Sequence, residues 1–369
     1  MTEELTVFTP TEKTYEIAPG KTRWKSPSNI ALVKYWGKKP HQIPENPSIS
    51  FTLQNAYTET QIDWEEKTQS EGEIPLEFYF EGEKNPAFEN RIQKFLTAIS
   101  DYFPFLTRLK LKIASRNTFP HSSGIASSAS AMSALAMCLV DMEQIFLKNS
   151  GHLPLDREFF FKKASFISRL GSGSASRSVF PEVAVWGGCD IPGSDDLFAV
   201  DLSKNLHKEF KGYRDDIIIV DREKKSVSSS AGHSLMKDHI YSGVRYNHAK
   251  QNVNRLDAIL QSGDLCDFID MVEFEALNLH SLMMTSNPGF ILIKPNTLQI
   301  INKIREYRQD TSIPVCFTLD AGPNVHILYP DRHAHTVKTF IQEELLCYSQ
   351  GEYWIEDCMG QGPKKISTE

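Results

Sequence analysis

The sequence predicts an α+β protein in which two lobes meet at a cleft. The chain has 369 residues, and because about 150 residues per domain is a common size, two domains are expected. Alternating apolar residues predict strands in the first half, and a helical period follows from Met132. Apolar runs from Val315 to Leu319 and from Val325 to Tyr329 flank the turn DAGPN and predict a hairpin.

The first half is expected to hold antiparallel strands and then a long helix. Alternation predicts half-buried strands at Thr58–Trp64 and Leu76–Phe80, and the pattern continues at 109–113. Behind a Gly/Ser-rich loop, apolar residues recur at helical spacing from Met132 to Phe146. The apolar run 217–220, which follows a polar stretch, places the predicted boundary between an N-terminal domain, residues 1–212, and a C-terminal domain, residues 213–369.

Composition indicates a globular protein of a reducing compartment. Hydrophobic residues make up 40% of the chain and charged residues 24%, which is ordinary for such proteins. The net charge of -7 argues against an extended surface for nucleic acid or anionic membrane. The N-terminus lacks the pattern of a signal peptide, and the six cysteines form no CxxC pair. We expect a cytoplasmic protein with neither a nucleic acid nor a membrane as partner.

The segment PHSSGIASSASA, from Pro120, has two interpretations that stay open. A Gly/Ser loop before a helix offers unpaired amides and a favourable dipole to a phosphate. The same composition also suits a Ser-rich cap on an Ala-rich helix. The GK[ST] ending of a Walker A loop is missing.

Three further segments carry candidate binding groups. GSGSASRS places Arg177 among serines, which suits a carboxylate or a diphosphate, although a surface loop has the same composition. SNIALVKYWGKK combines Asn29 and Tyr35 with lysines, and it could equally be a strand with solvated lysines. TLDAGPNV puts Asp320 at a strand end, where an ordinary turn is the local alternative. A buried carboxylate beside a lysine can instead orient or deprotonate an alcohol.

Together, these motifs and their order resemble those of the diphosphomevalonate decarboxylase family within the GHMP kinase superfamily. The matching elements, which span most of the chain, are NIALVKYWGK from Asn29, SISFTL from Ser48, GIASSAS from Gly124, GSGSASRS from Gly171, VSSSAG from Val227 and DAGPN from Asp320.

The resemblance implies a two-lobed GHMP kinase fold with a central active-site cleft, and a homodimer. It implies that ATP and Mg²⁺ are used to convert mevalonate 5-diphosphate to isopentenyl diphosphate, ADP, phosphate and CO₂. The 3-hydroxyl is phosphorylated, and the 3-phosphate and CO₂ are then lost.

The resemblance also implies roles for individual residues. Asp320 would be the catalytic base or orienting carboxylate, and Lys34 would hold it ionised. Arg177, with Asn29 beside it, would face the substrate carboxylate. The implied diphosphate ligands are Tyr35, Lys38, Ser172 and Ser174. The implied nucleotide-binding residues are Ser122, Ser123, Gly124, Ala126, Ser127, Ser128, Ser228 and Ser229, with Ser127 also a candidate metal ligand.

The sequence departs from the family pattern at two places, and several alternative functions stay open. PHSSGIASSA replaces the common PTAAGLASSA, and SVFPEVAVWG follows Arg177 where a Gly-Gly pair is frequent. The alternatives are a mevalonate or phosphomevalonate kinase, a monophosphate-specific decarboxylase, and a non-catalytic sensor of ATP or a metabolite. Because Asp320, Lys34 and Arg177 are all present, decarboxylation is favoured.

Overall fold

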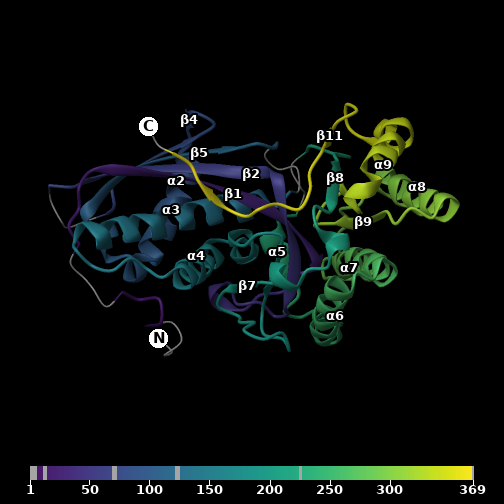
Figure 1. Cartoon of the computed structure of the whole chain (residues 1–369), viewed down its shortest axis with the longest axis horizontal. Helices are drawn as coiled ribbons and strands as arrows, with labels where there is room; N and C mark the ends of the chain where they lie inside the picture. The colour runs from purple at the N-terminus through teal and green to yellow at the C-terminus, as the bar shows by residue number, and fades with distance from the viewer. Residues whose placement is uncertain (1–5, 11–14, 69–72, 121–124, 224–226, 368–369) are drawn as a thin grey trace.

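The computed structural model describes residues 6–10, 15–68, 73–120, 125–223 and 227–367, and it contains two lobes side by side (Figure 1). Within these ranges, the N-terminal lobe is built on an eight-stranded sheet and the C-terminal lobe on a four-stranded sheet, each covered by helices. The α+β prediction with two lobes is therefore confirmed.

Long antiparallel strands form the centre of the N-terminal sheet. Its order is β12-β1-β2-β5-β3-β4, and β6 and β7 extend it from β2. These strands are β1 (Gly20–Val33), β2 (Ser48–Glu66), β3 (Leu76–Phe80), β4 (Glu83–Lys84), β5 (Leu109–Asn117), β6 (Val183–Trp186), β7 (Ala199–Asp201) and β12 (Lys364–Lys365).

One predicted pairing is wrong. We expected antiparallel strands throughout the first half, but β3 pairs with β5 in parallel. The chain between them contains the helix α2 (Pro86–Ala98), which carries it back across the sheet before β5 begins. Parallel neighbours need such a crossover, and alternation within a strand does not reveal it.

The helices α3 (Ser127–Asn149) and α4 (Arg157–Gly171) complete the N-terminal lobe. The predicted helical period from Met132 to Phe146 lies within α3, so the helix is confirmed. By length and composition α3 could cross a membrane, but 78% of the apolar window is buried inside the lobe. Since Ala and Leu residues surround its axis, we assign α3 as the core helix of this lobe.

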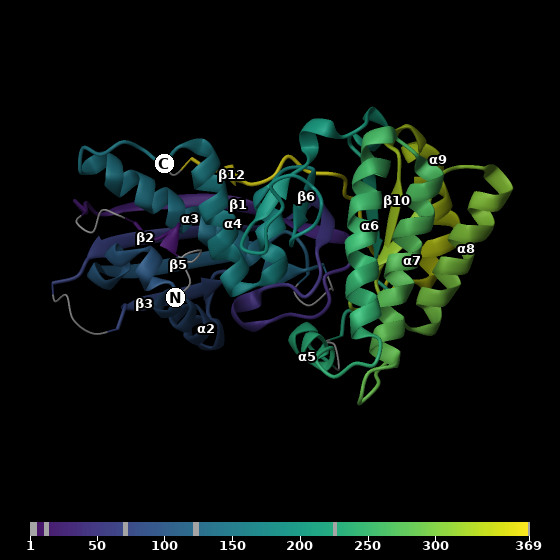
Figure 2. The ribbon, with the colours of Figure 1, turned by 90° about the horizontal axis from the view of Figure 1, so that it is seen from below.

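The C-terminal lobe contains the predicted hairpin. Its sheet has the order β11-β8-β10-β9, and β9 and β10 pair antiparallel. Figure 2 shows α6, α7 and α8 next to one another across this sheet. The elements of the lobe are β8 (Arg214–Ile218), β9 (Cys316–Leu319), β10 (Val325–Tyr329), β11 (Trp354–Ile355), α5 (Ser229–Leu235), α6 (Ser242–Ser262), α7 (Leu265–Met284), α8 (Pro295–Thr311) and α9 (Ala334–Phe340).

Short helical turns join the longer elements, and η4 carries part of the site described below. They are the 3-10 turns η1 (Pro40–Gln42), η2 (Ser100–Tyr102), η3 (Pro104–Arg108), η4 (Gly173–Val179), η5 (Ser203–Asn205), η6 (Lys208–Phe210), η7 (Asp331–His333) and η9 (Leu346–Tyr348), and the π-turn η8 (Ile341–Leu345).

The two lobes are joined by apolar packing and by a C-terminal strand that pairs with the N-terminal sheet. Leu32 and Phe51 of the N-terminal sheet belong to the same buried cluster as Val272 and Phe268 of α7, and the rings of Phe51 and Phe268 stack at 5.9 Å. The C-terminal segment returns to the N-terminal lobe, where β12 pairs with β1 (Figure 1). This packing holds the lobes together around the cavity between them. The division at residues 212 and 213 stays a prediction.

Candidate active site

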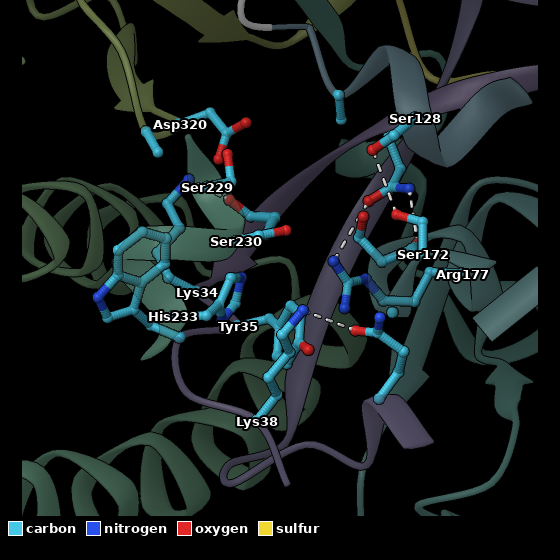
Figure 3. Close-up of a pocket in the computed structure, with 18 of the residues that line it drawn as sticks. Lys34, Tyr35, Lys38, Ser128, Ser172, Arg177, Ser229, Ser230, His233 and Asp320 are labelled. Atoms are coloured by element: carbon cyan, nitrogen blue, oxygen red, sulfur yellow. Dashed lines mark hydrogen bonds between the residues drawn. The ribbon is translucent and has the colours of Figure 1, made fainter. Parts of the chain in front are cut away.

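A cavity lies between the lobes, where segments far apart in the sequence meet (Figure 3). The predicted residues that line it are Asn29, Lys34, Tyr35, Lys38, Ala126, Ser128, Ser172, Ser174, Arg177, Ser229 and Asp320. Ser127 and Ser228 flank this lining without belonging to it. Ser122, Ser123 and Gly124 lie outside the residues that the structure describes.

Lys34 and Asp320 approach the cavity from different lobes. Lys34 follows β1, and Asp320 follows β9 at the turn of the hairpin. Lys34 Nζ donates hydrogen bonds to Thr318 Oγ1 at 2.8 Å and to the carbonyl of Ala31. Burial lowers the pKa of the Lys34 ammonium to about 8, although the charge of Asp320 opposes this shift. The lysine thus lies within the field of the carboxylate and is anchored by neutral oxygens.

A buried ion pair holds the backbone of Lys34. Arg245 of α6 and Glu275 of α7 form a salt bridge of 2.7 Å, with side-chain exposures of 1% and 0%. Glu275 Oε2 accepts a hydrogen bond from the Lys34 amide, and Arg245 Nη2 donates one to the Lys34 carbonyl, both at 2.9 Å. Asn252 donates a further bond to Glu275. The C-terminal lobe therefore fixes the position of a residue from the N-terminal lobe.

Arg177 lies on η4, across the cavity from Asp320 (Figure 3). Its guanidinium donates to Ser50 Oγ at 3.0 Å, to Ser48 Oγ, and to Asn29 Oδ1 at 3.4 Å. All three partners are neutral, and burial lowers the pKa of Arg177 to about 10. A buried guanidinium held by neutral oxygens suits an anionic ligand, because the ligand can supply the opposite charge.

Close backbone packing shapes the loop that carries Ser172 and Ser174. A Cβ atom at Gly173 would lie only 2.8 Å from the Tyr35 hydroxyl and the Trp186 ring, so the glycine permits this approach. Ser172 Oγ lies 3.2 Å from Ser128 Oγ at the start of α3. The loop therefore links the predicted substrate side of the cavity to the predicted nucleotide side.

The start of α3 has the features of an anion-binding helix end. Ala126, in the N-cap position, has φ 30°, and its side chain makes no cap hydrogen bond. The Ala129 amide already donates to the Ala126 carbonyl at 2.7 Å. The amides of Ser127 and Ser128 precede it, and because the first amides of a helix lack acceptors within the helix, they can donate to phosphate oxygens. Ser128 lines the cavity, and Ser127 lines a second pocket beside it.

This second pocket is apolar and opens next to the first turn of α3. Phe78 and Phe80 of β3 line it together with Phe88 and Phe95 of α2. Arg91, Ser128 and Gly171 line both pockets, so the two are adjacent. A flat aromatic group attached to a phosphate chain would fit this arrangement.

The two predicted serines of VSSSAG, Ser228 and Ser229, occupy different positions. Ser228 caps α5 by accepting a hydrogen bond from the Ala231 amide at 3.2 Å. Ser229 lines the cavity, and so does Ser230. If the Ser228 hydroxyl donates to a phosphate, its oxygen must still accept the hydrogen bond that caps α5.

Sequence reasoning missed several residues around the cavity. Ser48 and Ser50 belong to the matched SISFTL element, yet their contact with Arg177 had no local signal. Glu275 and Arg245 resemble ordinary charged residues of helices. His233, which also lines the cavity, follows the matched VSSSAG element directly. The usable clues were the place of Ser48 and Ser50 within a matched motif and the position of His233 beside one.

Two family models match the chain along most of its length. A model described as the diphosphomevalonate decarboxylase-like N-terminal domain matches residues 26–196. A model described as the mevalonate 5-diphosphate decarboxylase C-terminal domain matches residues 217–366. The chain belongs to the diphosphomevalonate decarboxylase family. The resemblance inferred from the motifs is confirmed.

Named relatives and solved structures agree with this assignment. The diphosphomevalonate decarboxylase of Candida albicans is 26% identical over 332 residues, which are 86% of each chain. The phosphomevalonate decarboxylase of Haloferax volcanii is 24% identical over 327 residues, 88% of this chain and 91% of the relative.

Among solved structures, the mevalonate diphosphate decarboxylase of Staphylococcus aureus matches with a TM-score of 0.79 and 27% identity, covering 95% of this chain and 99% of its own. A structure described as MDDEF in complex with MVAPP, AMPPCP and magnesium matches with a TM-score of 0.77 and 26% identity, covering 95% of this chain and 100% of its own. The GHMP kinase fold implied by the resemblance is thus confirmed.

Proposed function

We propose that the protein is an ATP-dependent decarboxylase that converts mevalonate 5-diphosphate to isopentenyl diphosphate, ADP, phosphate and CO₂. The observation that carries this proposal is the cavity that joins Asp320, Lys34 and Arg177 to the start of α3. Membership of the decarboxylase family supports the same reaction.

Asp320 acts on the 3-hydroxyl of the substrate. Its carboxylate orients this alcohol or accepts its proton while the oxygen attacks the γ-phosphorus of ATP. Lys34 lies close enough for its charge and that of Asp320 to influence each other. At neutral pH, below its pKa of about 8, Lys34 is charged and favours the ionised carboxylate.

ATP occupies the side of the cavity at α3. The first turn of α3, with Ala126, Ser127 and Ser128, suits the phosphate chain, and the apolar pocket lined by Phe80 and Phe88 suits the base. A solved structure similar to this chain contains AMPPCP and magnesium. Mg²⁺ neutralises phosphate charge when it is bound, and the hydroxyl of Ser127 is our candidate ligand for it.

Arg177 faces the carboxylate of the substrate, with Asn29 beside it. After phosphorylation, the C3–O bond breaks and its electron pair leaves with the phosphate. The bond between C2 and the carboxylate carbon breaks as CO₂ departs, and its electrons form the double bond between C2 and C3. A fixed guanidinium orients the carboxylate for this step, because its fork matches two carboxylate oxygens.

Tyr35, Lys38, Ser172 and Ser174 hold the diphosphate. Among the described residues, the Tyr35 hydroxyl is buried without a hydrogen-bond partner, and burial raises its pKa, so it stays a donor. A substrate with a single phosphate would leave part of this set unused. Because one relative is named phosphomevalonate decarboxylase, activity with the monophosphate must be compared with activity with the diphosphate.

A homodimer formed through α6 and α7 is part of the proposal. Val244 of α6 is 73% exposed and Phe274 of α7 is 44% exposed. His248 lies one turn after Val244, and its ring centroid is 5.2 Å from that of Phe274. These residues therefore share one outer face of α6 and α7. Sedimentation of wild type should give a dimer and Val244→Glu a monomer. A wild-type monomer at micromolar concentration would contradict this part. The cytoplasmic location stays a prediction.

Product analysis tests the proposed function. Purified protein is incubated with ATP, Mg²⁺ and either mevalonate 5-diphosphate, mevalonate 5-phosphate or mevalonate, and products are identified by ³¹P NMR. We expect isopentenyl diphosphate from the diphosphate, with the highest kcat/KM of the three. A phosphorylated product that keeps its carboxylate would indicate a kinase. ATP binding without turnover of any substrate would indicate a sensor.

A further inference from the structure

His233 of α5 lines the cavity although the proposed reaction has not used it. Its ring lies against two aromatic rings of the matched KYWGK element, with centroids 4.3 Å from Tyr35 and 4.6 Å from Trp36. The residue is 9% exposed. Figure 3 shows it close to Tyr35, on the side of the cavity that also holds Lys38.

One hydrogen bond fixes the tautomer of this histidine. The Gly37 amide donates to His233 Nδ1 at 3.0 Å, so Nδ1 carries a lone pair and the proton of the neutral ring is on Nε2. Gly37 has φ +99°, and a Cβ there would clash with the Tyr246 hydroxyl. The amide direction therefore depends on a backbone conformation that glycine supplies.

The ring stays neutral at physiological pH. Burial, with a smaller contribution from the charge of Lys38, lowers the pKa of His233 to about 3, and the charge of Asp320 opposes this shift. His233 thus presents an N–H group without adding a positive charge beside Lys38. The Tyr35 hydroxyl, which has no partner among the described residues, is a second neutral donor nearby.

We propose that His233 is a substrate-positioning residue that donates a hydrogen bond from Nε2 to a phosphate oxygen of the substrate, next to Tyr35 and Lys38. Two neutral donors and one ammonium then surround the same anionic group. This inference rests on the proposed function, since it takes the phosphorylated end of mevalonate 5-diphosphate as the ligand.

Two substitutions distinguish the role of Nδ1 from the role of Nε2. The side chain of His233→Gln can place an amide N–H where Nε2 lies. The shorter side chain of His233→Asn can offer its oxygen to the Gly37 amide but has no donor at the Nε2 position. We expect His233→Asn to raise KM for mevalonate 5-diphosphate about tenfold or more, because hydrogen bonds to charged groups are the stronger class. His233→Gln should stay within about threefold of wild type, and kcat should change less than KM in both.

A purely structural role predicts the reverse order. If His233 only anchors Gly37, His233→Asn should resemble wild type and His233→Gln should be impaired, and that result would overturn the inference. Equal KM values for both variants and wild type would also overturn it. Matched substitutions at exposed His335, on α9, serve as controls, and thermal unfolding shows whether each variant is folded.

A measurement on wild type covers the case in which neither variant folds. Long-range ¹H–¹⁵N spectra of protein with labelled histidine report the His233 Nε2–H group. Saturating mevalonate 5-diphosphate, without ATP, should move this resonance, with the proton still on Nε2. Binding without a shift would refute the role of His233 and leave the proposed function intact. Absence of both binding and turnover would instead contradict the proposed function.

Discussion

The two sides of the cavity differ in what holds their polar groups. On the side that we propose for the substrate, protein contacts hold Lys34 and Arg177 before any ligand binds. On the side that we propose for ATP, α3 starts at Ser127 after Ala126, whose side chain makes no cap hydrogen bond, and the helix borders an apolar pocket. The first side is preorganised by the protein, whereas a ligand completes the second. Changes on the first side should therefore affect substrate binding, turnover or stability, and changes on the second should affect ATP binding alone.

The largest effect is expected from Asp320→Asn. The carboxamide has nearly the same shape but cannot accept the proton of the alcohol, so kcat should fall about 10³-fold. KM for mevalonate 5-diphosphate should change little, because most binding contacts remain. Initial rates of ADP formation measure both constants. Asp310→Asn, at an exposed position of α8, is the control. Turnover near that of wild type in Asp320→Asn would refute the assignment of the catalytic carboxylate.

Arg245→Met tests the preorganisation of the substrate side. The change leaves Glu275 buried without its cation, and breaking one partner of such a pair costs about 3 kcal/mol in the free energy of unfolding. Urea unfolding measures it. The matched control is Arg255→Met, since Arg255 pairs with Asp267 between the same two helices but is 57% exposed. This control should change stability little. Equal losses in both variants would show that the buried pair has no special role.

The pH dependence of kcat/KM tests the charge of Lys34. Its pKa is lowered to about 8 by burial, so the residue loses its charge above that pH. We expect kcat/KM to fall about tenfold per pH unit between pH 8.5 and 10. Lys34→Arg should flatten this decline, since arginine keeps its charge. A profile that stays level to pH 9.5 in wild type would contradict the role of the lysine.

The same shift predicts the effect of Lys34 on stability. Between its folded pKa of about 8 and the ordinary lysine value of 10.5, the unfolded chain binds more protons than the folded one. The contribution of this residue to the free energy of unfolding therefore rises with pH in this window. Loss of activity above pH 8 thus cannot come from unfolding driven by Lys34, and circular dichroism at each pH checks that the fold persists.

The smallest effect is expected on the nucleotide side, from Ala126→Asp. A carboxylate at the start of α3 repels phosphates, so KM for ATP should rise about fivefold. KM for mevalonate 5-diphosphate and the stability should not worsen, because a negative charge is favourable at a helix start. Ala126→Asn has nearly the same size without the charge and should resemble wild type. If both variants weaken ATP binding equally, the effect is steric, and the proposed phosphate position is wrong.

Local patterns predicted much of the fold. The helical period from Met132 predicted α3, and the apolar runs around DAGPN predicted the hairpin that carries Asp320. Both signals depend on residues a few positions apart. The parallel pairing of β3 with β5 and the return of β12 to β1 depend on the path of the whole chain, and no local pattern contains it.

The site was predictable to the extent that motifs carry it. Single segments left a turn or a cap as an equal alternative, and only their combination pointed to one cavity. The contacts that support the motifs were not predictable, because Glu275 lies 241 positions from Lys34 in the chain. A buried glutamate and an exposed one look the same in a sequence.

The most direct test of the central claim is the stoichiometry of one reaction. Wild-type protein is given ATP, Mg²⁺ and mevalonate 5-diphosphate labelled in the carboxylate, and ADP and labelled CO₂ are measured at the same times. The account predicts one CO₂ for each ADP throughout the time course. ADP without CO₂ would show that the cavity only transfers phosphate, and it would contradict the assignment of the protein as a decarboxylase.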